Sequence, residues 1–341
     1  MGGMERASCN IANALNNLNN EVLFLSIFKQ ERFFKLNEKI KFSEPKGDMN
    51  TKKLNMLKTI LWIRKEVRKY NPDVVLVYNN FYSSIAMLAL SGTHYPVFIS
   101  DRASPLFNWP KHIKLFNAVV FRLFRPKGVI AQTNIAKQYQ RRFFSKKVPI
   151  KVIPNMVREI KNYDLHKKNQ VLAVGRLGDY LKGFDRLIDA FSLVKTDWKL
   201  VIAGGDENGE YLKKQARELN ILNRIEFLGQ VKDIDKIYTE SKIFVIPSRS
   251  EGFPNALCEA MAAGLACISY DFIAGPRDII ENNIDGFIVE DGNLENLADK
   301  ITYLINNSNI REEVGDKAKE SIKKLKANNI ANMTMRFLFE E

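Results

Sequence analysis

The chain has few cysteines and few histidines for its length, three of each in 341 residues. Cys9, Cys258 and Cys267 stand at no spacing that chelates zinc, and an odd number in a large chain does not indicate a disulfide framework. We expect the three thiols to be reduced, as in a cytoplasmic protein, and to lie in the hydrophobic core. A disulfide-stabilised secreted scaffold and a cysteine-based zinc site are therefore excluded as interpretations.

Long apolar runs are also missing from the sequence. No stretch reaches the roughly 18 residues that a membrane-spanning helix needs, and the N-terminus has no basic region followed by an apolar one. We expect a protein that is neither secreted nor integral to a membrane. The chain is long enough for two domains of roughly 150 residues each, and its 45% of hydrophobic residues are ample for two cores.

Acidic residues are absent from one long segment of the chain. None occurs between Asp101 and Glu159, in a protein whose net charge is +13. Large apolar residues are interspersed with cations there, as in "KHIKLFNAVVFRLFRPKG" and "YQRRFFSKK". The basic residues of the segment are Arg102, Lys111, Lys114, Arg122, Arg125, Lys127, Lys137, Arg141, Arg142, Lys146, Lys147, Lys151 and Arg158.

This basic segment indicates an anionic partner, and its chemistry leaves alternatives open. An anionic membrane surface suits the mixture, because each nearby cation contributes about 1 kcal/mol and Phe and Leu can enter the interface. A core helix whose lysines lie along its surface is the simpler alternative. Nucleic acid fits less well, since no recognition motif accompanies the segment, so we expect no nucleic-acid partner. We expect a cytoplasmic protein, peripheral on the inner face of the cell membrane.

Short β-branched runs alternate with helical patterns along almost the whole chain. Continuous apolar strands followed by helices predict parallel sheets covered on both faces, which makes the fold class α/β. In open parallel sheets ligands bind beyond the carboxyl ends of the strands. The expected strands cover 21–28, 73–79, 96–100, 128–133, 150–155, 170–175, 198–205, 224–229, 242–248, 265–271 and 285–290.

A polar segment at 156–169, "MVREIKNYDLHKKN", separates the two groups of strands and predicts a linker. We therefore expect one Rossmann-like domain over 1–157 and a second over 158–325. The last stretch, 326–341, carries an apolar face and is expected to complete the first domain. The two doubly wound sheets would face each other across a cleft that holds the chemistry.

The stretch "SRSEGFPNALCEAMAAG", residues 248–264, contains two carboxylates around a predicted helix start. Pro254 and Asn255 suit the first positions of a helix, whose N–H groups and dipole attract a phosphate. Glu251 and Glu259 both repel phosphate, so each carboxylate is better explained by a neutral hydroxylated group as its neighbour. One such group would lie on each side of the phosphate. A nucleotide sugar has that layout of ribose, diphosphate and hexose; a capping acid and a solvated glutamate are the simpler alternative.

A second stretch, "VGRLGDYLKGFDRLIDAF" at 174–191, places two cations in a glycine-bearing loop between a strand and a helix. Arg176 can bind phosphate bidentately and Lys182 supplies a mobile positive charge, which together match a diphosphate. Two cations in one loop are more often a solvated surface. Their expected place at the same sheet edge as Glu251 favours the binding interpretation.

These stretches, together with "VIAGGDENGEYL", "IEFLGQVKDIDKIYTESKIFVIPS" and "GPRDIIENNIDGFIV", resemble the retaining, nucleotide-sugar-dependent glycosyltransferases of family 4, including those that assemble polysaccharides. The resemblance covers 170–290 densely and the first half more thinly. It implies the GT-B fold, with an acceptor-side domain over 1–157. It also implies a UDP-sugar donor as co-substrate, no metal and no other cofactor, and an α-linkage made with retention of configuration.

The resemblance also implies roles for particular residues. Glu251 would contact the donor hexose near the reacting carbon, and Glu259 would bond the ribose hydroxyls. Arg176 and Lys182 would hold the diphosphate and stabilise the charge of the leaving group. The remaining implied donor contacts are made by the backbone: the amides of Phe253, Asn255 and Ala256 at the sugar and phosphate, and Val231 at the uracil ring.

The sequence departs from the family at two places. Many members have a histidine where "FISDRASP" has Arg102, and an arginine cannot serve as a general base at neutral pH. Arg102 would instead stabilise charge or place the acceptor. Members also begin with a strand that enters a glycine pair, whereas this chain opens on "MGGMERASCNIANAL" with Gly2 and Gly3. Those glycines would bring the backbone close to the donor sugar or acceptor, and we expect the true start to lie upstream or the gene to be a fragment.

We therefore expect a metal-independent transferase that moves a hexose or N-acetylhexosamine from a UDP-sugar to a growing glycan for surface polysaccharide. The acceptor is expected to be linked to polyprenyl diphosphate. A truncated, non-catalytic nucleotide-sugar-binding protein is the alternative. Retention of UDP binding without transfer would favour it.

Overall fold

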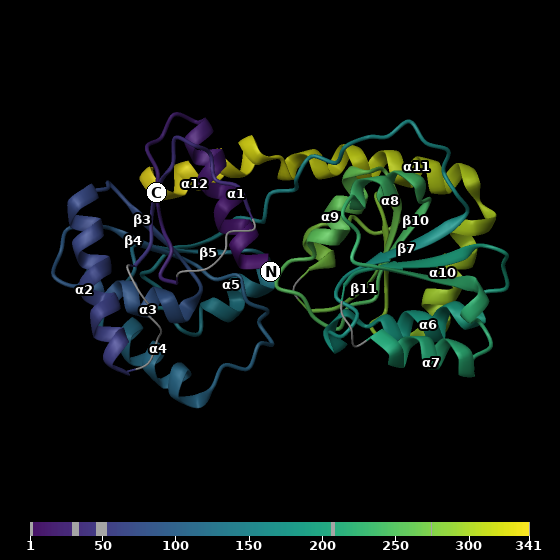
Figure 1. Ribbon diagram of the computed structural model, residues 1–341, viewed down its shortest axis with the longest axis horizontal. Helices are drawn as coiled ribbons and strands as arrows, with labels where there is room; N and C mark the ends of the chain where they lie inside the picture. The colour runs from purple at the N-terminus through teal and green to yellow at the C-terminus, as the bar shows by residue number, and fades with distance from the viewer. Residues whose placement is uncertain (1–2, 29–33, 46–52, 206–208, 274, 341) are drawn as a thin grey trace. The chain divides into compact units, whose positions relative to one another are not determined.

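The computed structural model describes residues 3–28, 34–45, 53–205, 209–273 and 275–340 (Figure 1). The chain divides into two compact units: unit 1 comprises Met1–Met156 and Ala327–Glu341, and unit 2 comprises Val157–Lys326. The boundaries expected from the sequence, 157/158 and 325/326, each lie one residue from the boundaries in the structure. The polar segment 156–169 contains no helix or strand.

Unit 1 is built on a parallel sheet with the strand order β3-β4-β5-β6. A second, two-stranded parallel sheet pairs β1 with β2. The described residues of unit 1 show no hydrogen-bonded ladder that joins the two sheets. The strands are β1 (Leu23–Leu25), β2 (Lys41–Ser43), β3 (Val75–Tyr78), β4 (Val97–Ser100), β5 (Gly128–Ala131) and β6 (Ile150–Val152).

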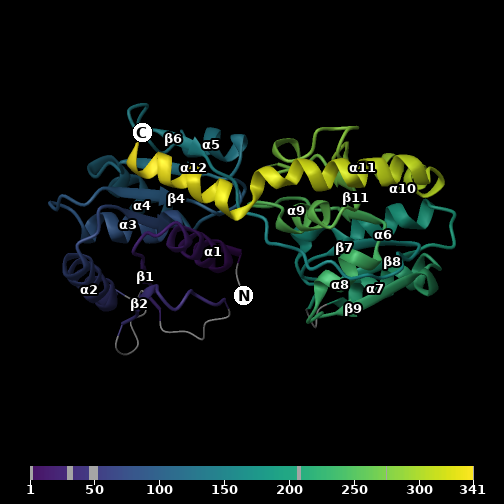
Figure 2. The ribbon, with the colours of Figure 1, turned by 90° about the horizontal axis from the view of Figure 1, so that it is seen from above.

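The helices of unit 1 cover both faces of the four-stranded sheet (Figure 1). Side chains alternate along β4: Val97 and Ile99 join the core cluster under α2, α3 and α4, whereas the Phe98 ring meets Phe337 of α12 at 5.5 Å. Helices α1 and α12 pack against each other (Figure 2). The helices are α1 (Gly3–Asn17), α2 (Lys53–Tyr70), α3 (Asn80–Ala89), α4 (Lys111–Leu123), α5 (Asn134–Gln140) and α12 (Ala327–Phe339).

Unit 2 contains a six-stranded sheet with the order β12-β11-β10-β7-β8-β9, in which every neighbouring pair is parallel. Its central strands are almost fully buried, which explains their unbroken apolar sequences. The strands are β7 (Gln170–Val174), β8 (Lys199–Ala203), β9 (Ile225–Gly229), β10 (Ile243–Ile246), β11 (Ala266–Tyr270) and β12 (Phe287–Val289).

Helices lie on both faces of this sheet as well, with α6, α7 and α10 on one side and α8, α9 and α11 on the other (Figure 1). Short 3₁₀ turns connect several of them. The helices are α6 (Phe184–Leu193), α7 (Glu210–Glu218), α8 (Ile234–Glu240), α9 (Asn255–Ala262), α10 (Leu294–Asn306) and α11 (Ser308–Ser321). The 3₁₀ turns are η1 (Tyr180–Lys182), η3 (Leu222–Arg224), η4 (Pro276–Asp278) and η5 (Ile322–Leu325).

All eleven strands expected from the sequence are present, each shorter than expected by one to five residues. The prediction missed β2, because "KFS" is short and half-exposed and so lacks the apolar run that marks the other strands. Cys9, Cys258 and Cys267 are buried, as expected. Gly2 lies outside the described residues, and none of the helices described is long and apolar enough to cross a membrane.

Candidate functional site

The centre of the unit 2 sheet is a topological switch point between β7 and β10. From β7 the chain continues outward through β8 and β9, whereas β11 and β12 extend from β10 in the opposite direction. The loops that leave the carboxyl ends of β7 and β10 therefore diverge, and ligands of open parallel sheets bind at such points. These two loops carry Arg176, Lys182 and Glu251.

The two loops touch at Gly183, the residue between η1 and α6. Its φ of +68° lies in the left-handed region, and a Cβ there would be 2.0 Å from the carbonyl oxygen of Pro247. Only glycine permits both the conformation and the close approach. The backbone after β7 is thus held directly against the backbone after β10.

An ion pair between Lys182 and Glu251 spans the switch point. The lysine Nζ lies 2.8 Å from Oε1 and 3.0 Å from Oε2 of Glu251, and the hydroxyl of Ser248 donates to Oε1 at 2.7 Å. The two charged side chains are only 23% and 12% exposed. The structure therefore brings together the two residues that the sequence assigned to the diphosphate and the donor hexose.

Two arginines hold the loop after β10 in place. Arg186 of α6 donates to the carbonyl oxygens of Pro247 and Ser248, each at 2.7 Å from Nη2. Arg249 forms a bidentate pair with Asp185, at 2.7 and 2.6 Å. Burial alone would raise the pKa of Asp185, but the hydrogen bond and charge of Arg249 lower it overall. The position of Glu251 is therefore fixed by contacts to the residues just before it in the loop.

Arg176 lies in the same loop as Lys182 but makes a different contact. Its guanidinium is 69% exposed and pairs with Asp179, three residues along, at 2.8 Å. This exposed, local pair resembles the solvated surface that the sequence left open as an alternative for Arg176. Exposed pairs of this kind contribute little to stability, so the arginine can be drawn to another anion at small cost.

Helix α9 begins at Asn255, directly after Pro254, where the sequence predicted it. Phe253 is buried beneath this turn, whereas Asn255 and Ala256 are partly exposed. The N–H of Asn255 donates to the carbonyl of Phe253 at 2.9 Å. The start of α9 and its dipole therefore stand next to Glu251 in the chain, with one of the amides assigned to the ligand engaged internally.

Glu259 lies in the second turn of α9 and is 7% exposed, so it is not a solvated glutamate. Arg158 reaches it from the segment that enters unit 2, with Nε 3.3 Å from Oε1, and also pairs with Asp235 at 2.5 Å. The hydroxyl of Tyr238 donates to Oε2 of Glu259 at 3.3 Å. Burial opposes the charge of Asp235, yet its bond to Arg158 lowers the pKa of that carboxyl.

The other expected residues, Val231, Gly3 and Arg102, lie in earlier parts of the chain. Val231 is half-buried in the loop after β9, which also ends at the carboxyl edge of the unit 2 sheet. Gly3 is the first residue of α1 in unit 1. Arg102 follows β4 in unit 1, where its Nη1 donates to Oδ1 of Asn155 at 2.6 Å. Burial lowers the pKa of the Arg102 guanidinium overall, although the nearby Tyr78 and Asp101 act to raise it.

Sequence reasoning missed Arg158, Arg186, Arg249 and Tyr238. The expectation that Arg158 belongs to the basic surface is wrong, because Asp235 and Glu259 engage it, and both lie far from it in the sequence. Arg186 and Arg249 lie inside the two stretches 174–191 and 248–264 that the sequence singled out. Only the contact between the two loops shows that these arginines hold the loop after β10 in place. No group of three or more His, Cys, Asp or Glu that could hold a metal ion occurs among the residues described.

Comparisons with known proteins match both units. The model of "Glycosyl transferases group 1" matches residues 158–321, and the model of "Glycosyltransferase Family 4" matches residues 1–159. The chain is 26% identical, over 99% of its length and 95% of the relative's, to a Campylobacter jejuni enzyme, the GalNAc-α-(1→4)-GalNAc-α-(1→3)-diNAcBac-PP-undecaprenol α-1,4-N-acetyl-D-galactosaminyltransferase.

Two further comparisons agree with these matches. The amylovoran biosynthesis glycosyltransferase AmsD of Erwinia amylovora is 28% identical over 93% of this chain and 90% of that one. The crystal structure of Anabaena HepE in complex with UDP has a TM-score of 0.84 at 19% identity, covering 99% of this chain and 96% of that one. With both units matched and all three described sheets parallel, the chain belongs to glycosyltransferase family 4 and has the GT-B fold.

Proposed function

We propose that the chain transfers a hexose or N-acetylhexosamine from a UDP-sugar to a glycan acceptor, with retention of configuration and without a metal. The observation that carries this proposal is the Lys182–Glu251 pair at the switch point of unit 2. It places a cation and a carboxylate next to a helix start in one partly buried site. A diphosphate and a hydroxylated sugar are the two halves of a ligand that fits such a pair.

In this proposal, the residues of unit 2 act on charge that develops at the leaving group. Lys182 shifts from Glu251 toward the diphosphate, Arg176 joins it from the loop surface, and the start of α9 adds its dipole. Glu251, once released, accepts hydroxyl groups of the donor hexose, and the amides of Phe253 and Ala256 line the sugar and phosphate. These positive groups supply the stabilisation that a metal ion supplies elsewhere.

The nucleoside has its own set of proposed contacts in unit 2. Glu259, held by Arg158 and Tyr238, accepts the ribose hydroxyls, and the backbone at Val231 meets the uracil ring. In unit 1, Arg102 stabilises charge or places the acceptor, and Gly3 allows a close approach of the backbone. The crystal structures of Anabaena HepE with UDP and with UDP-glucose support a uridine donor.

The names of the relatives support a lipid-linked acceptor for surface polysaccharide. The Campylobacter jejuni relative acts on a glycan linked to undecaprenyl diphosphate, and the Erwinia amylovora relative acts in amylovoran biosynthesis. We propose an acceptor of the same class for this chain.

Release of UDP tests the proposed transfer. The purified chain is incubated with a panel of UDP-sugars, with and without membranes as acceptor, and with a chelator in parallel. We expect UDP release that the membranes stimulate and the chelator leaves unchanged, and an α-linkage in the product by NMR. UDP binding without release from any donor would instead favour a nucleotide-sugar-binding protein.

Helix α4 supports docking of unit 1 on an anionic membrane at the inner face of the cell membrane. Leu115, Val119 and Leu123 recur every four residues and are 67%, 48% and 69% exposed. The buried face of α4 is made instead by Asn117, Val120 and Phe121, so the simpler interpretation as a core helix does not account for the outer stripe. Exposed cations accompany this stripe, namely Lys111, Lys114, Arg122 and Arg125.

Vesicle binding is expected to depend on both components of this face. Replacing Arg122 and Arg125 with Gln should weaken binding to anionic vesicles about 30-fold, since each cation contributes about 1 kcal/mol. Leu123→Ser should weaken it further, whereas Leu193→Ser, at a 53% exposed position of unit 2, should not. Co-sedimentation measures the binding; equal binding to neutral vesicles, or no release in high salt, would contradict the electrostatic account.

A further inference from the structure

Buried polar side chains gather at the carboxyl edge of the four-stranded sheet of unit 1. Asn80 follows β3, Asp101 follows β4, Gln132 follows β5 and Asn155 follows β6. Their exposed fractions are 6%, 6%, 2% and 8%. Parallel sheets bind ligands at the carboxyl ends of their strands, and buried polar groups normally have hydrogen-bond partners. The buried polar groups at this edge therefore indicate a binding site.

Asp101 determines how two of the neighbouring amides are turned. Its Oδ2 accepts the amide N–H groups of Asn80, at 2.8 Å, and of Gln140. Turning either amide around would set its oxygen against the carboxylate, so both oxygens must point away from Asp101. Burial raises the pKa of Asp101 to about 6, and the carboxyl is therefore mostly ionised at neutral pH.

Within the described ranges of the chain, the amide oxygens that this arrangement turns away accept no hydrogen bond. Oδ1 of Asn80 and Oε1 of Gln140 are buried without a partner in the part of the chain that the structure describes, and so is Oε1 of Gln132. A buried acceptor left in this state costs about 1–3 kcal/mol. Of these three residues, Asn80 lines a pocket among the described residues, and its oxygen indicates a partner that donates a hydrogen bond.

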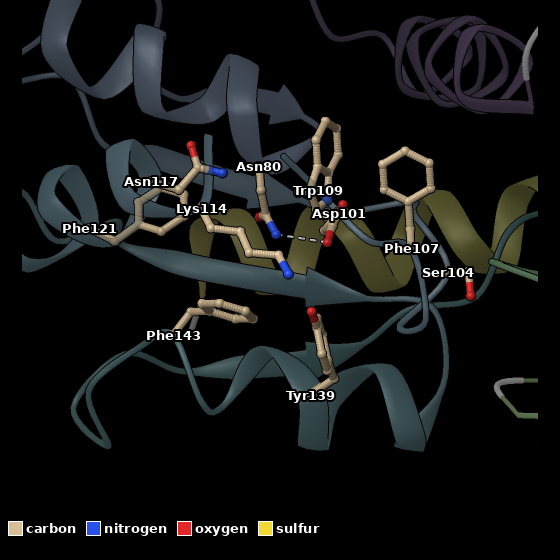
Figure 3. A pocket seen from close by; sticks show the side chains of 10 residues that line it. All are labelled: Asn80, Asp101, Ser104, Phe107, Trp109, Lys114, Asn117, Phe121, Tyr139 and Phe143. Atoms are coloured by element: carbon tan, nitrogen blue, oxygen red, sulfur yellow. Dashed lines mark hydrogen bonds between the residues drawn. The ribbon is translucent and has the colours of Figure 1, made fainter. Parts of the chain in front are cut away.

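Asn80 and Asp101 line a small pocket together with Lys114 and five aromatic rings (Figure 3). The rings are those of Phe107, Trp109, Phe121, Tyr139 and Phe143, and in Figure 3 the Asp101 carboxylate lies between Trp109 and Tyr139. The cavity holds about 20 Å³, room for one group of the size of a water molecule. Phe107 and Phe143 are 50% and 39% exposed, so the mouth is an aromatic surface open to solvent.

The chemistry of this pocket selects among ligands. The Asp101 carboxylate and the Lys114 ammonium group both line the pocket, so their charges offset each other and a neutral ligand suits it. A hydroxyl group can donate its one hydrogen to the unpartnered Oδ1 of Asn80. The aromatic mouth suits the apolar C–H face of a sugar ring. A single hydroxyl group fits the cavity while the ring stays outside against the aromatic residues.

We propose that this pocket of unit 1 binds one neutral pyranose unit of the acceptor, with one hydroxyl group donating to Oδ1 of Asn80 beside the Asp101 carboxylate. The inference rests on the proposed function for the identity of the ligand as an acceptor glycan. It assigns acceptor specificity to residues 80, 101, 107, 109, 139 and 143. The donor contacts proposed above, in unit 2, are separate from it.

Saturation-transfer NMR with methyl glycosides of glucose, galactose, N-acetylglucosamine and N-acetylgalactosamine tests the pocket. We expect transfer from the parent chain to at least one glycoside. Trp109→Leu and Phe143→Ala should weaken that binding at least about 10-fold, the loss expected when an aromatic contact worth roughly 1.4 kcal/mol is removed. Phe339→Ala, which removes a 53% exposed ring of α12, is the matched control and should bind as the parent does.

UDP binding and thermal unfolding are measured on the same variants, and both should be unchanged. If a chain that binds UDP shows no saturation transfer to any of the glycosides, the inference is overturned and only ordered water is left as the occupant of the pocket. Glycoside binding that survives both aromatic substitutions would overturn it as well. If glycosides bind as expected but no UDP-sugar is hydrolysed, the pocket is supported and the proposed transferase function fails.

Discussion

Replacing Lys182 with Met is expected to lower the turnover of the UDP-sugar by about 10²- to 10³-fold, the cost of removing one group that stabilises developing negative charge. Lys182 is the cation bound to Glu251 at 2.8 and 3.0 Å, 23% exposed, at the switch point of unit 2. In the proposed reaction it moves to the diphosphate as the bond to the sugar breaks. Without it, the leaving group meets an uncompensated carboxylate.

A second variant separates this chemical effect from folding. Lys182→Met alone leaves the Glu251 charge largely buried, with the hydroxyl of Ser248 still donating to it, which should also lower the thermal midpoint. Adding Glu251→Gln removes the unpaired charge, so the double variant should regain stability but not turnover. UDP release and thermal unfolding are the two measurements.

Another lysine pair of unit 2 supplies the control. Lys317 and Glu313 form a 2.6 Å pair on α11 in which both side chains are about half exposed, and Lys317→Met should leave turnover and stability nearly unchanged. Full turnover by Lys182→Met would show that this lysine serves only to hold Glu251, and the proposed diphosphate contact would have to be abandoned.

Substitution of Gly183 by Ala is expected to reduce the free energy of unfolding by at least about 3 kcal/mol. The left-handed φ of +68° costs an alanine about 1–2 kcal/mol. The remainder comes from the new Cβ, which would stand 2.0 Å from the backbone carbonyl of Pro247 and force the loop after β10 to shift. Because that loop carries Glu251, turnover should fall together with stability.

Gly229→Ala isolates the steric part of this effect. Gly229 has a similar φ, +63°, but a Cβ there would meet no atom of the described residues within 4 Å. Its substitution should therefore cost only the backbone term of about 1–2 kcal/mol. Urea unfolding of both variants provides the comparison. Equal losses of stability would mean that contact between the two loops contributes nothing beyond the conformation of Gly183.

The alternation of apolar strands and helices was sufficient to predict the α/β class, because a strand buried on both faces must be apolar throughout. The start of α9 could be predicted as well, since Pro254 and the following Asn255 favour a helix start by local chemistry alone. The short strand β2 was not predictable in this way. Its three residues owe their conformation to pairing with β1, which lies about twenty residues earlier in the chain.

In the candidate site, too, some residues could be predicted from the local sequence and others could not. Residue type and spacing singled out Lys182, Glu251 and Glu259, because their chemistry suits a nucleotide sugar and they flank predicted helix starts. The same reasoning grouped Arg158 with the surface cations. Its actual partners, Asp235 and Glu259, are separated from it by more than seventy residues of chain, and no local sequence pattern predicts such an ion pair.

The sequence by itself determined the parallel sheets, the two-domain division, the family and the residue types of the site, since each of these depends on periodicity or on motifs within short stretches. Tertiary structure alone decided that Lys182 binds Glu251, that Arg186 and Arg249 brace the loop between them, and that Asp101 turns two amide oxygens away from itself. The physical reason is that a hydrogen bond or ion pair needs atoms within about 3–4 Å of each other. For residues distant in the chain, that proximity exists only once the strands have taken their order in the sheet.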